Sequence, residues 1–331
     1  MGRHFFKRHQ GRGSYDLFST YNRYLPGVGG MFGMFGLFLV GSALGSMINA
    51  ALQLVLGQDF VLEYGTLISY PVMFIPPMLY ASVRSRMSNI FDKAYALDSS
   101  NFGQRGGFVM AMTVSLATIA AACLMEPVSA LLPQMPEWFE KIMNQVMEGS
   151  PLWATLISVS VFAPFFEEWL CRGIVLRGLL NRTSPAAAIC ISAAFFAILH
   201  MNPWQAVPAF GLGLLFGYVY YKTGSLRLTM LMHCVNNTLA AIFSRIPASF
   251  WLKFAWPLYG ISIALLLLVL VAGESVNGAR RWINIAGLQF QPSEIAKFTM
   301  IVLFARLTKG FGTSAKEFRY GVLGFGGALL G

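Results

Sequence analysis

Long apolar runs recur along the whole chain and are separated by short polar joints. A helix needs about 20 mostly apolar residues to cross the hydrocarbon core of a bilayer. Such runs are predicted near residues 28–56, 65–83, 108–132, 152–180, 185–200, 205–221 and 226–243, and again near 254–272 and 292–307. The sequence therefore predicts an all-α, polytopic bundle of transmembrane helices, with about seven spans before Pro247 and about two after it.

The composition agrees with a bilayer environment. Of the 331 residues, 56% are hydrophobic and 11% are charged, whereas soluble domains carry roughly 25% charged residues. The formal net charge of +10 could indicate a nucleic-acid partner, but the basic residues gather in the amino-terminal tail and in the joints. Cytoplasmic loops of membrane proteins collect Lys and Arg in this way. We therefore expect a lipid bilayer as partner and no nucleic acid.

The distribution of Lys and Arg also predicts an orientation. The tail over residues 1–27 and the joint over residues 84–105 are basic. The joint between the first two runs carries Asp59 and Glu63. This alternation places the amino terminus in the cytoplasm. Residues 135–147 carry apolar side chains on one helical face, the pattern of a helix that lies at the membrane surface.

Ionisable side chains inside apolar spans are costly to bury and mark a functional site by default. Within residues 163–172, the fourth run carries Glu167, Glu168 and Arg172. Residues four apart on a helix share a face, so Glu168 can pair with Arg172. Adjacent residues point about 100° apart, which leaves Glu167 facing another direction, where it can act as a general base. The alternative is an ion-pair network that only stabilises the end of the helix.

Two of the four histidines also lie in apolar runs. His200 ends the fifth run, immediately before a helix-breaking Met-Asn-Pro sequence. His233 lies inside the seventh run, and Asn237 follows one turn later on the same face. A single buried histidine is more often a satisfied core residue than a catalytic one. Three polar clusters on three apolar spans, each suited to acid–base chemistry or to stabilising an oxyanion, favour a shared active site.

The three clusters resemble the motifs of the CPBP family, the CAAX proteases and bacteriocin-processing enzymes. The matching patterns are Glu167-Glu168-x-x-x-Arg172, Phe196-x-x-x-His200 and His233-x-x-x-Asn237. The resemblance extends over about residues 65–245. It implies an intramembrane endopeptidase that hydrolyses a peptide bond of a membrane-associated protein or peptide. It also implies that Glu168 and Arg172 are supporting residues.

The same resemblance divides the catalytic roles. Glu167 with His200 would hold and deprotonate the attacking water, and His233 with Asn237 would donate hydrogen bonds to the oxyanion. Two histidines and one glutamate could instead form a three-ligand zinc site, made of Glu167, His200 and His233. The sequence contains no HExxH, and we favour the mechanism without a metal.

The carboxyl-terminal part resembles a second family, the SEDS glycan polymerases of bacterial cell elongation and division. The resemblance rests on Asn-Gly-Ala-Arg-Arg-Trp at residues 277–282 and Gln-Pro-Ser-Glu at residues 291–294, and it covers about residues 254–331. Because such polymerases contain several more spans, we expect a fragment that contributes membrane anchorage and no chemistry. The expected domains are a basic tail over 1–27, a protease core over 28–247 and the appended fragment over 248–331.

Two other functions stay open. The same scaffold could serve as a non-catalytic immunity or regulatory protein of the membrane, and replacing Glu167 or His200 would then leave its phenotype intact. A cell-wall glycan polymerase would instead bind lipid-linked precursors through Arg280, Arg281 and Glu294. The complete set of protease motifs favours the endopeptidase.

Overall fold

The computed structural model describes residues 24–87, 97–100, 102, 106–129, 131–276, 279–285 and 288–311. The chain divides into two compact units, Met1–Phe243 and Ser244–Gly331. This division falls near the predicted domain boundary at residue 247. The predicted basic tail lies outside the described residues, apart from residues 24–27.

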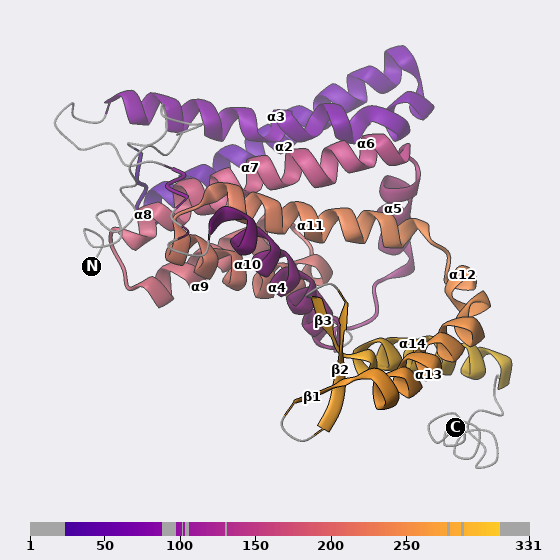
Figure 1. Cartoon of the computed structure of the whole chain (residues 1–331). Helices are drawn as coiled ribbons and strands as arrows, with labels where there is room; N and C mark the ends of the chain where they lie inside the picture. Colours follow the sequence, from indigo (N-terminus) through magenta and orange to yellow (C-terminus); the bar gives the residue numbers. More distant parts are fainter. Residues whose placement is uncertain are drawn as a thin grey trace. The chain divides into compact units, whose positions relative to one another are not determined.

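The first unit consists of helices (Figure 1). Their bounds are α2 Val28–Leu56, α3 Gln58–Met87, α4 Gly106–Ser129, α5 Glu137–Glu148, α9 Pro185–Leu199, α10 Pro203–Thr223 and α11 Leu226–Arg245. A long helical segment between α5 and α9 comprises α6 Leu152–Leu156, η3 Ile157–Phe162, α7 Ala163–Glu168, η4 Trp169–Leu176 and α8 Arg177–Leu180. A helix is present at every predicted run of this unit, and the predicted all-α class is confirmed.

Several helices are long and apolar enough to cross a membrane, which identifies an integral membrane protein. In the described part of the chain these are Val28–Leu56, Gln58–Met87, Gly106–Ser129, Leu152–Leu180 and Ala255–Ala272. α9 is apolar but shorter, at 15 residues. α10 and α11 lie at predicted spans and are not among the five, and α11 carries the polar side chains of His233 and Asn237.

α3 is longer than its prediction, residues 65–83, at both ends. Asp59 and Glu63 were expected in a polar joint, and this expectation is wrong because both lie inside the helix. Gly57, with φ of 90°, separates α2 from α3 in a conformation that suits glycine. Asp59 then occupies the first turn of α3, where the helix dipole stabilises a negative charge.

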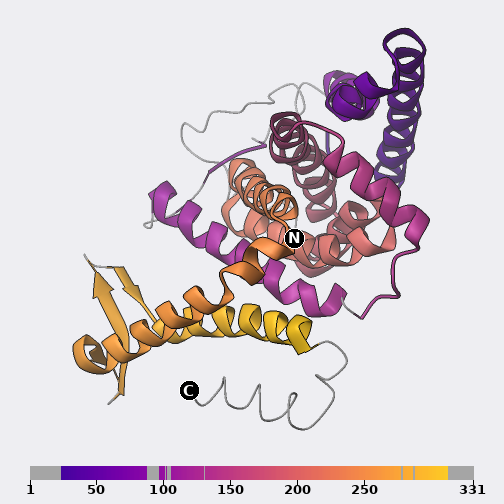
Figure 2. The same ribbon diagram turned by 90° about the vertical axis from the view of Figure 1, so that its right-hand side faces the viewer.

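The helices of the first unit pack in neighbouring pairs. α2 lies along α3 and α9 lies along α10 (Figure 1), and the turned view of Figure 2 shows α2 and α3 beside the group of α9, α10 and α11. α2 approaches α3 closely at Gly41, where an added Cβ would overlap the backbone carbonyl of Met73. The main core gathers side chains from α2, α3, η4 and α9.

A buried carboxylate fixes the start of α11. The Leu226 N–H donates to Oδ1 of Asp98 at 3.1 Å, and the Arg227 guanidinium contacts the other oxygen of the same carboxylate. Asp98 is 2% exposed, so it satisfies a backbone donor that the helix cannot satisfy itself. This contact positions the helix that carries His233 and Asn237.

The second unit contains two longer helices and a small sheet. Its elements are α12 Ala248–Lys253, α13 Ala255–Ala272, β1 Glu274–Val276, β2 Ala279–Ile285, β3 Leu288–Phe290 and α14 Pro292–Phe311. The strands form an antiparallel sheet in the order β1-β2-β3, with Ile283 opposite Phe290. The sequence predicted only a polar stretch here, because strands of three residues are too short for an alternating pattern to stand out.

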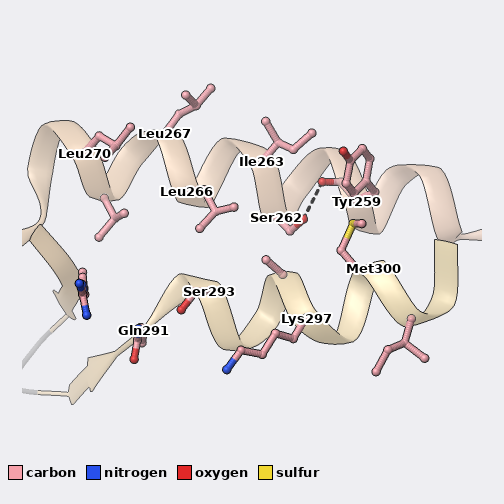
Figure 3. Close-up of a pocket in the computed structure, with 14 residues that line it drawn as sticks. Tyr259, Ser262, Ile263, Leu266, Leu267, Leu270, Gln291, Ser293, Lys297 and Met300 are labelled. Carbon is pink, nitrogen blue, oxygen red and sulfur yellow. Dashed lines mark hydrogen bonds between the residues drawn. The ribbon is translucent and has the colours of Figure 1, made fainter. Parts of the chain in front are cut away.

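An apolar groove of about 910 Å³ lies between α13 and α14 (Figure 3). Leu266 and Leu270 line it from α13, while Gln291 and Ser293 lie at the end near the strands. Its lining residues all belong to the second unit. The groove therefore does not include the predicted catalytic residues, which all lie in the first unit.

Candidate functional site

Glu167 and Glu168 end α7, between two irregular turns of one long helix. The segment before α7, η3, and the segment after it, η4, are both π-helical. π-helical turns are rare and occur frequently at functional sites. Regular helix geometry is therefore interrupted on both sides of the two carboxylates.

Glu168 and Arg172 form the ion pair that their spacing predicts. Arg172 Nη1 donates to Oε1 of Glu168 at 2.7 Å, and both side chains are fully buried. Arg172 Nη2 also donates to the Gly213 carbonyl of α10 at 3.1 Å. The guanidinium lies over the rings of Phe196 and Phe216, 4.5 Å and 5.3 Å from their centroids. The pair thus connects the long helix to α9 and α10.

Glu167 has different neighbours from Glu168. Its side chain is 12% exposed, and Oε1 accepts a hydrogen bond from the Tyr70 hydroxyl of α3. Oε2 is buried and has no hydrogen-bond partner among the described residues. That oxygen lies 3.9 Å from Nε2 of His233. One carboxylate oxygen is therefore held by a phenol, and the other faces an imidazole.

His233 contacts both glutamates. It is 3% exposed, and its Nδ1 lies 3.0 Å from Oε1 of Glu168 while Nε2 faces Glu167. An ionised carboxylate only accepts hydrogen bonds, so Nδ1 carries a proton in this contact. A second proton, on Nε2, would make the ring positively charged, and the carboxylate of Glu168 compensates that charge.

His200 is held by a tight turn at the end of α9. Its Nδ1 lies 3.0 Å from the Phe196 carbonyl oxygen. A carbonyl oxygen only accepts hydrogen bonds, so Nδ1 carries the proton in this contact. In a neutral ring, Nε2 then keeps its lone pair. Met201 follows with φ of 53°, an uncommon conformation for a residue with a side chain. Asn202 then caps α10, because its Oδ1 accepts a hydrogen bond from the Gln205 N–H at 2.9 Å.

The two imidazoles meet at the ring of Phe196. The centroid of this ring lies 5.1 Å from that of His200 and 5.5 Å from that of His233, both edge-to-face. Edge-to-face contacts are favourable arrangements of aromatic rings. Both histidines therefore pack on one aromatic side chain. His233 also lies close to Glu167.

Asn237 is oriented by two hydrogen bonds. Its Nδ2 donates to the Val159 carbonyl of η3 at 2.7 Å, and Asn236 donates to its Oδ1 at 3.1 Å. An amide nitrogen carries two hydrogens, and the contact with Val159 uses one of them. Asn237 lies one turn from His233 on α11.

The alternative zinc site was expected to use Glu167, His200 and His233. Within the described ranges, no three His, Cys, Asp or Glu side chains are grouped closely enough to hold a metal ion. A zinc site made of Glu167, His200 and His233 stays a prediction.

Sequence reasoning missed Tyr70 and the contact between Glu168 and His233. Tyr70 lies in an apolar run without a motif, and its single signal is a hydroxyl within a predicted span. The contact of Glu168 with His233 joins residues 65 positions apart. It connects the end of α7 with α11.

Two family models match parts of the chain, and both predicted resemblances are confirmed. Residues 149–239 match the type II CAAX prenyl endopeptidase Rce1-like family. Residues 220–324 match the cell cycle protein family of FtsW, RodA and SpoVE. The first match contains every predicted catalytic residue: Glu167, His200, His233 and Asn237.

Curated relatives are similar over short stretches of the chain. They include proteins of Acinetobacter baylyi, Hydrogenovibrio crunogenus and Buchnera aphidicola, each described as a probable peptidoglycan glycosyltransferase FtsW. The Acinetobacter protein is 42% identical over 77 residues, which cover 22% of this chain and 19% of the relative. The Hydrogenovibrio protein is 37% identical over 78 residues, which cover 24% of this chain and 20% of the relative. The Buchnera protein is 42% identical over 87 residues, which cover 26% of this chain and 21% of the relative. The chain therefore spans about a fifth of the length of these relatives. No solved structure matches it.

Proposed function

We propose that this protein is an intramembrane endopeptidase that hydrolyses a peptide bond of a membrane-associated protein or peptide. The match of residues 149–239 to a CAAX endopeptidase family supports a protease. The observation that carries the proposal is the buried oxygen of Glu167, which lies 3.9 Å from Nε2 of His233 in a bundle of apolar helices. Placing an ionisable group within apolar membrane helices costs free energy, so such a group indicates a functional site.

Glu167 and His200 would hold the attacking water. Glu167 can take the proton of this water on Oε2, because Oε1 is engaged by Tyr70. His200 offers the lone pair of Nε2, because its Nδ1–H is donated to the Phe196 carbonyl. Two acceptors of this kind orient a water molecule, and the carboxylate removes its proton as the oxygen attacks the peptide carbonyl.

His233 and Asn237 would stabilise the oxyanion of the tetrahedral intermediate. His233 would donate from Nε2–H, with Glu168 compensating the charge of the ring. Asn237 would donate the amide hydrogen that does not go to Val159. Donors placed in advance around a developing charge are usually the largest contribution to such a reaction. When the carbon–nitrogen bond breaks, Glu167 returns the proton to the leaving amine.

The protease core is assigned to residues 28–247, and residues 248–331 are assigned membrane anchorage. The relatives described as peptidoglycan glycosyltransferases share about a fifth of their length with this chain, and their activity is not part of the proposal. The Lys and Arg distribution supports a cytoplasmic amino terminus. The bacterial sources of the relatives support a bacterial cytoplasmic membrane.

A comparison of membrane proteomes tests the proposal. Cells that express the wild-type protein, Glu167→Gln or His200→Ala are compared for new amino termini of membrane proteins. We expect at least one new terminus that appears with the wild type and with neither variant. Glu140→Gln, which changes an exposed glutamate of α5, is the matched control and should cleave as the wild type does.

Two results would contradict the proposal. The first is a set of new termini that is the same for the wild type and Glu167→Gln. The second is a cellular phenotype that needs the protein and survives in both variants, which would favour a non-catalytic scaffold.

A further inference from the structure

Tyr70 adds a helix to the candidate site. Its hydroxyl, on α3, donates a hydrogen bond to Oε1 of Glu167 on α7, across 97 positions of sequence. Tyr70 falls outside residues 149–239, the segment that matches the endopeptidase family. The matched segment alone therefore does not contain every side chain that contacts the proposed base.

Aromatic packing fixes the position of the Tyr70 ring. It stacks on Phe74 with 5.8 Å between the centroids, and Phe74 stacks on Phe166 at 5.2 Å with an angle of 13°. Phe74 is 1% exposed and also packs against Phe38 of α2. Because Phe166 directly precedes Glu167, this column of rings sets the distance between α3 and the helical turn that carries the glutamate.

The contact with Tyr70 distinguishes the two oxygens of the carboxylate. A general base must present one oxygen to the proton that it removes. The phenol on Oε1 restricts rotation of the carboxylate, and Oε2 then faces His233 at 3.9 Å. A misplacement of about 1 Å in a reacting group can cost on the order of 100-fold in rate. Loss of this one contact should therefore be measurable.

We propose that Tyr70 is a positioning residue for Glu167, whose hydroxyl holds Oε1 so that Oε2 points to the attacking water. This inference rests on the proposed function and deepens the role of the same carboxylate. The competing explanation is that Tyr70 only fills space between α3 and α7. In that case the activity would depend on the ring of Tyr70 and not on its hydroxyl.

The test uses Tyr70→Phe, which removes the hydroxyl and retains the stacked ring. The matched control is Tyr80→Phe on the same helix, whose ring packs edge-to-face on Tyr24 with 5.8 Å between the centroids. The probe is the membrane protein whose new amino terminus depends on Glu167, reconstituted with the full chain in lipid vesicles. We expect kcat of Tyr70→Phe to fall by about 100-fold with KM and the unfolding midpoint unchanged, and Tyr80→Phe to match the wild type.

A double-mutant cycle with Glu167→Asp separates positioning from packing. The shorter aspartate cannot reach Tyr70 in the same way, so adding Tyr70→Phe to Glu167→Asp should cause no further loss of activity. Two results would overturn this inference and leave the proposed function standing. One is a wild-type kcat for Tyr70→Phe. The other is that Tyr70→Phe lowers kcat by the same factor in the wild-type chain and in Glu167→Asp. If no cleavage depends on Glu167, the proposed function and this inference fall together.

Discussion

Nδ1 of His233 lies 3.0 Å from Oε1 of Glu168, the same oxygen that accepts a hydrogen bond from Arg172 at 2.7 Å. One buried oxygen thus joins α7, η4 and α11. Glu168 and Arg172 are both fully buried, and a buried ion is tolerated only with its partners in place. The stability of the bundle and the orientation of His233 therefore depend on the same carboxylate.

The first prediction concerns stability. Glu168→Gln leaves the buried guanidinium of Arg172 without its carboxylate, so we expect the free energy of unfolding to fall by about 3–5 kcal/mol. Chemical unfolding in detergent micelles measures this change, with the exposed Glu140→Gln as control. An unchanged unfolding midpoint for Glu168→Gln would show that the ion pair does not hold the helices together.

The second prediction separates stability from activity. Adding Arg172→Met to Glu168→Gln removes the uncompensated charge, and an apolar replacement of a buried ion pair is often neutral or stabilising. The double variant should regain stability relative to Glu168→Gln. Its cleavage activity should stay low, because no carboxylate then compensates the ring of His233. Unfolding and cleavage are measured on the same preparation, and activity that recovers along with stability would contradict the role given to Glu168.

The third prediction concerns the oxyanion. Asn237→Ala removes a donor near His233, and loss of one such donor lowers kcat by roughly 100- to 1000-fold. KM should change little, because the donor acts on charge that develops during the reaction. Thr238→Ala, one position along α11, is the control. A variant that loses affinity for substrate and retains kcat would place Asn237 in substrate binding instead.

The fourth prediction concerns the packing of α2 on α3. Gly41→Ala places a Cβ against the backbone carbonyl of Met73, and overpacking of this kind costs about 1–3 kcal/mol. Gly36, on the same helix, has open space where its Cβ would be. Gly36→Ala should therefore be neutral or stabilising, because alanine favours helix over glycine by up to about 1 kcal/mol. Equal unfolding midpoints for the two variants would argue against the close approach of α2 and α3.

The sequence predicted those parts of the site that local geometry determines. Glu168 and Arg172 pair because residues four apart on a helix share a face, and the structure shows this pair at 2.7 Å. His233 and Asn237 share one face of α11 for the same reason. His200 stands at a helix end because the Met-Asn-Pro sequence cannot continue α9.

Contacts between distant helices could not be predicted in this way. Tyr70 reaches Glu167 through the packing of α3 on α7, and no pattern near either residue encodes that contact. The two π-helical segments that flank α7 leave no mark in the apolar periodicity of residues 152–180. The first turns of α3 were mistaken for a joint because Asp59 and Glu63 are charged, although an acidic residue suits the start of a helix.

Cleavage in heavy-oxygen water tests most directly whether Glu167 activates a water molecule. The purified protein, in lipid vesicles with the substrate that the proteome comparison identifies, is sampled within a single turnover by mass spectrometry. We predict that one heavy oxygen enters the new carboxyl terminus with the wild type and that Glu167→Gln yields no product. A labelled product that forms with Glu167→Gln at the wild-type rate would contradict the central claim.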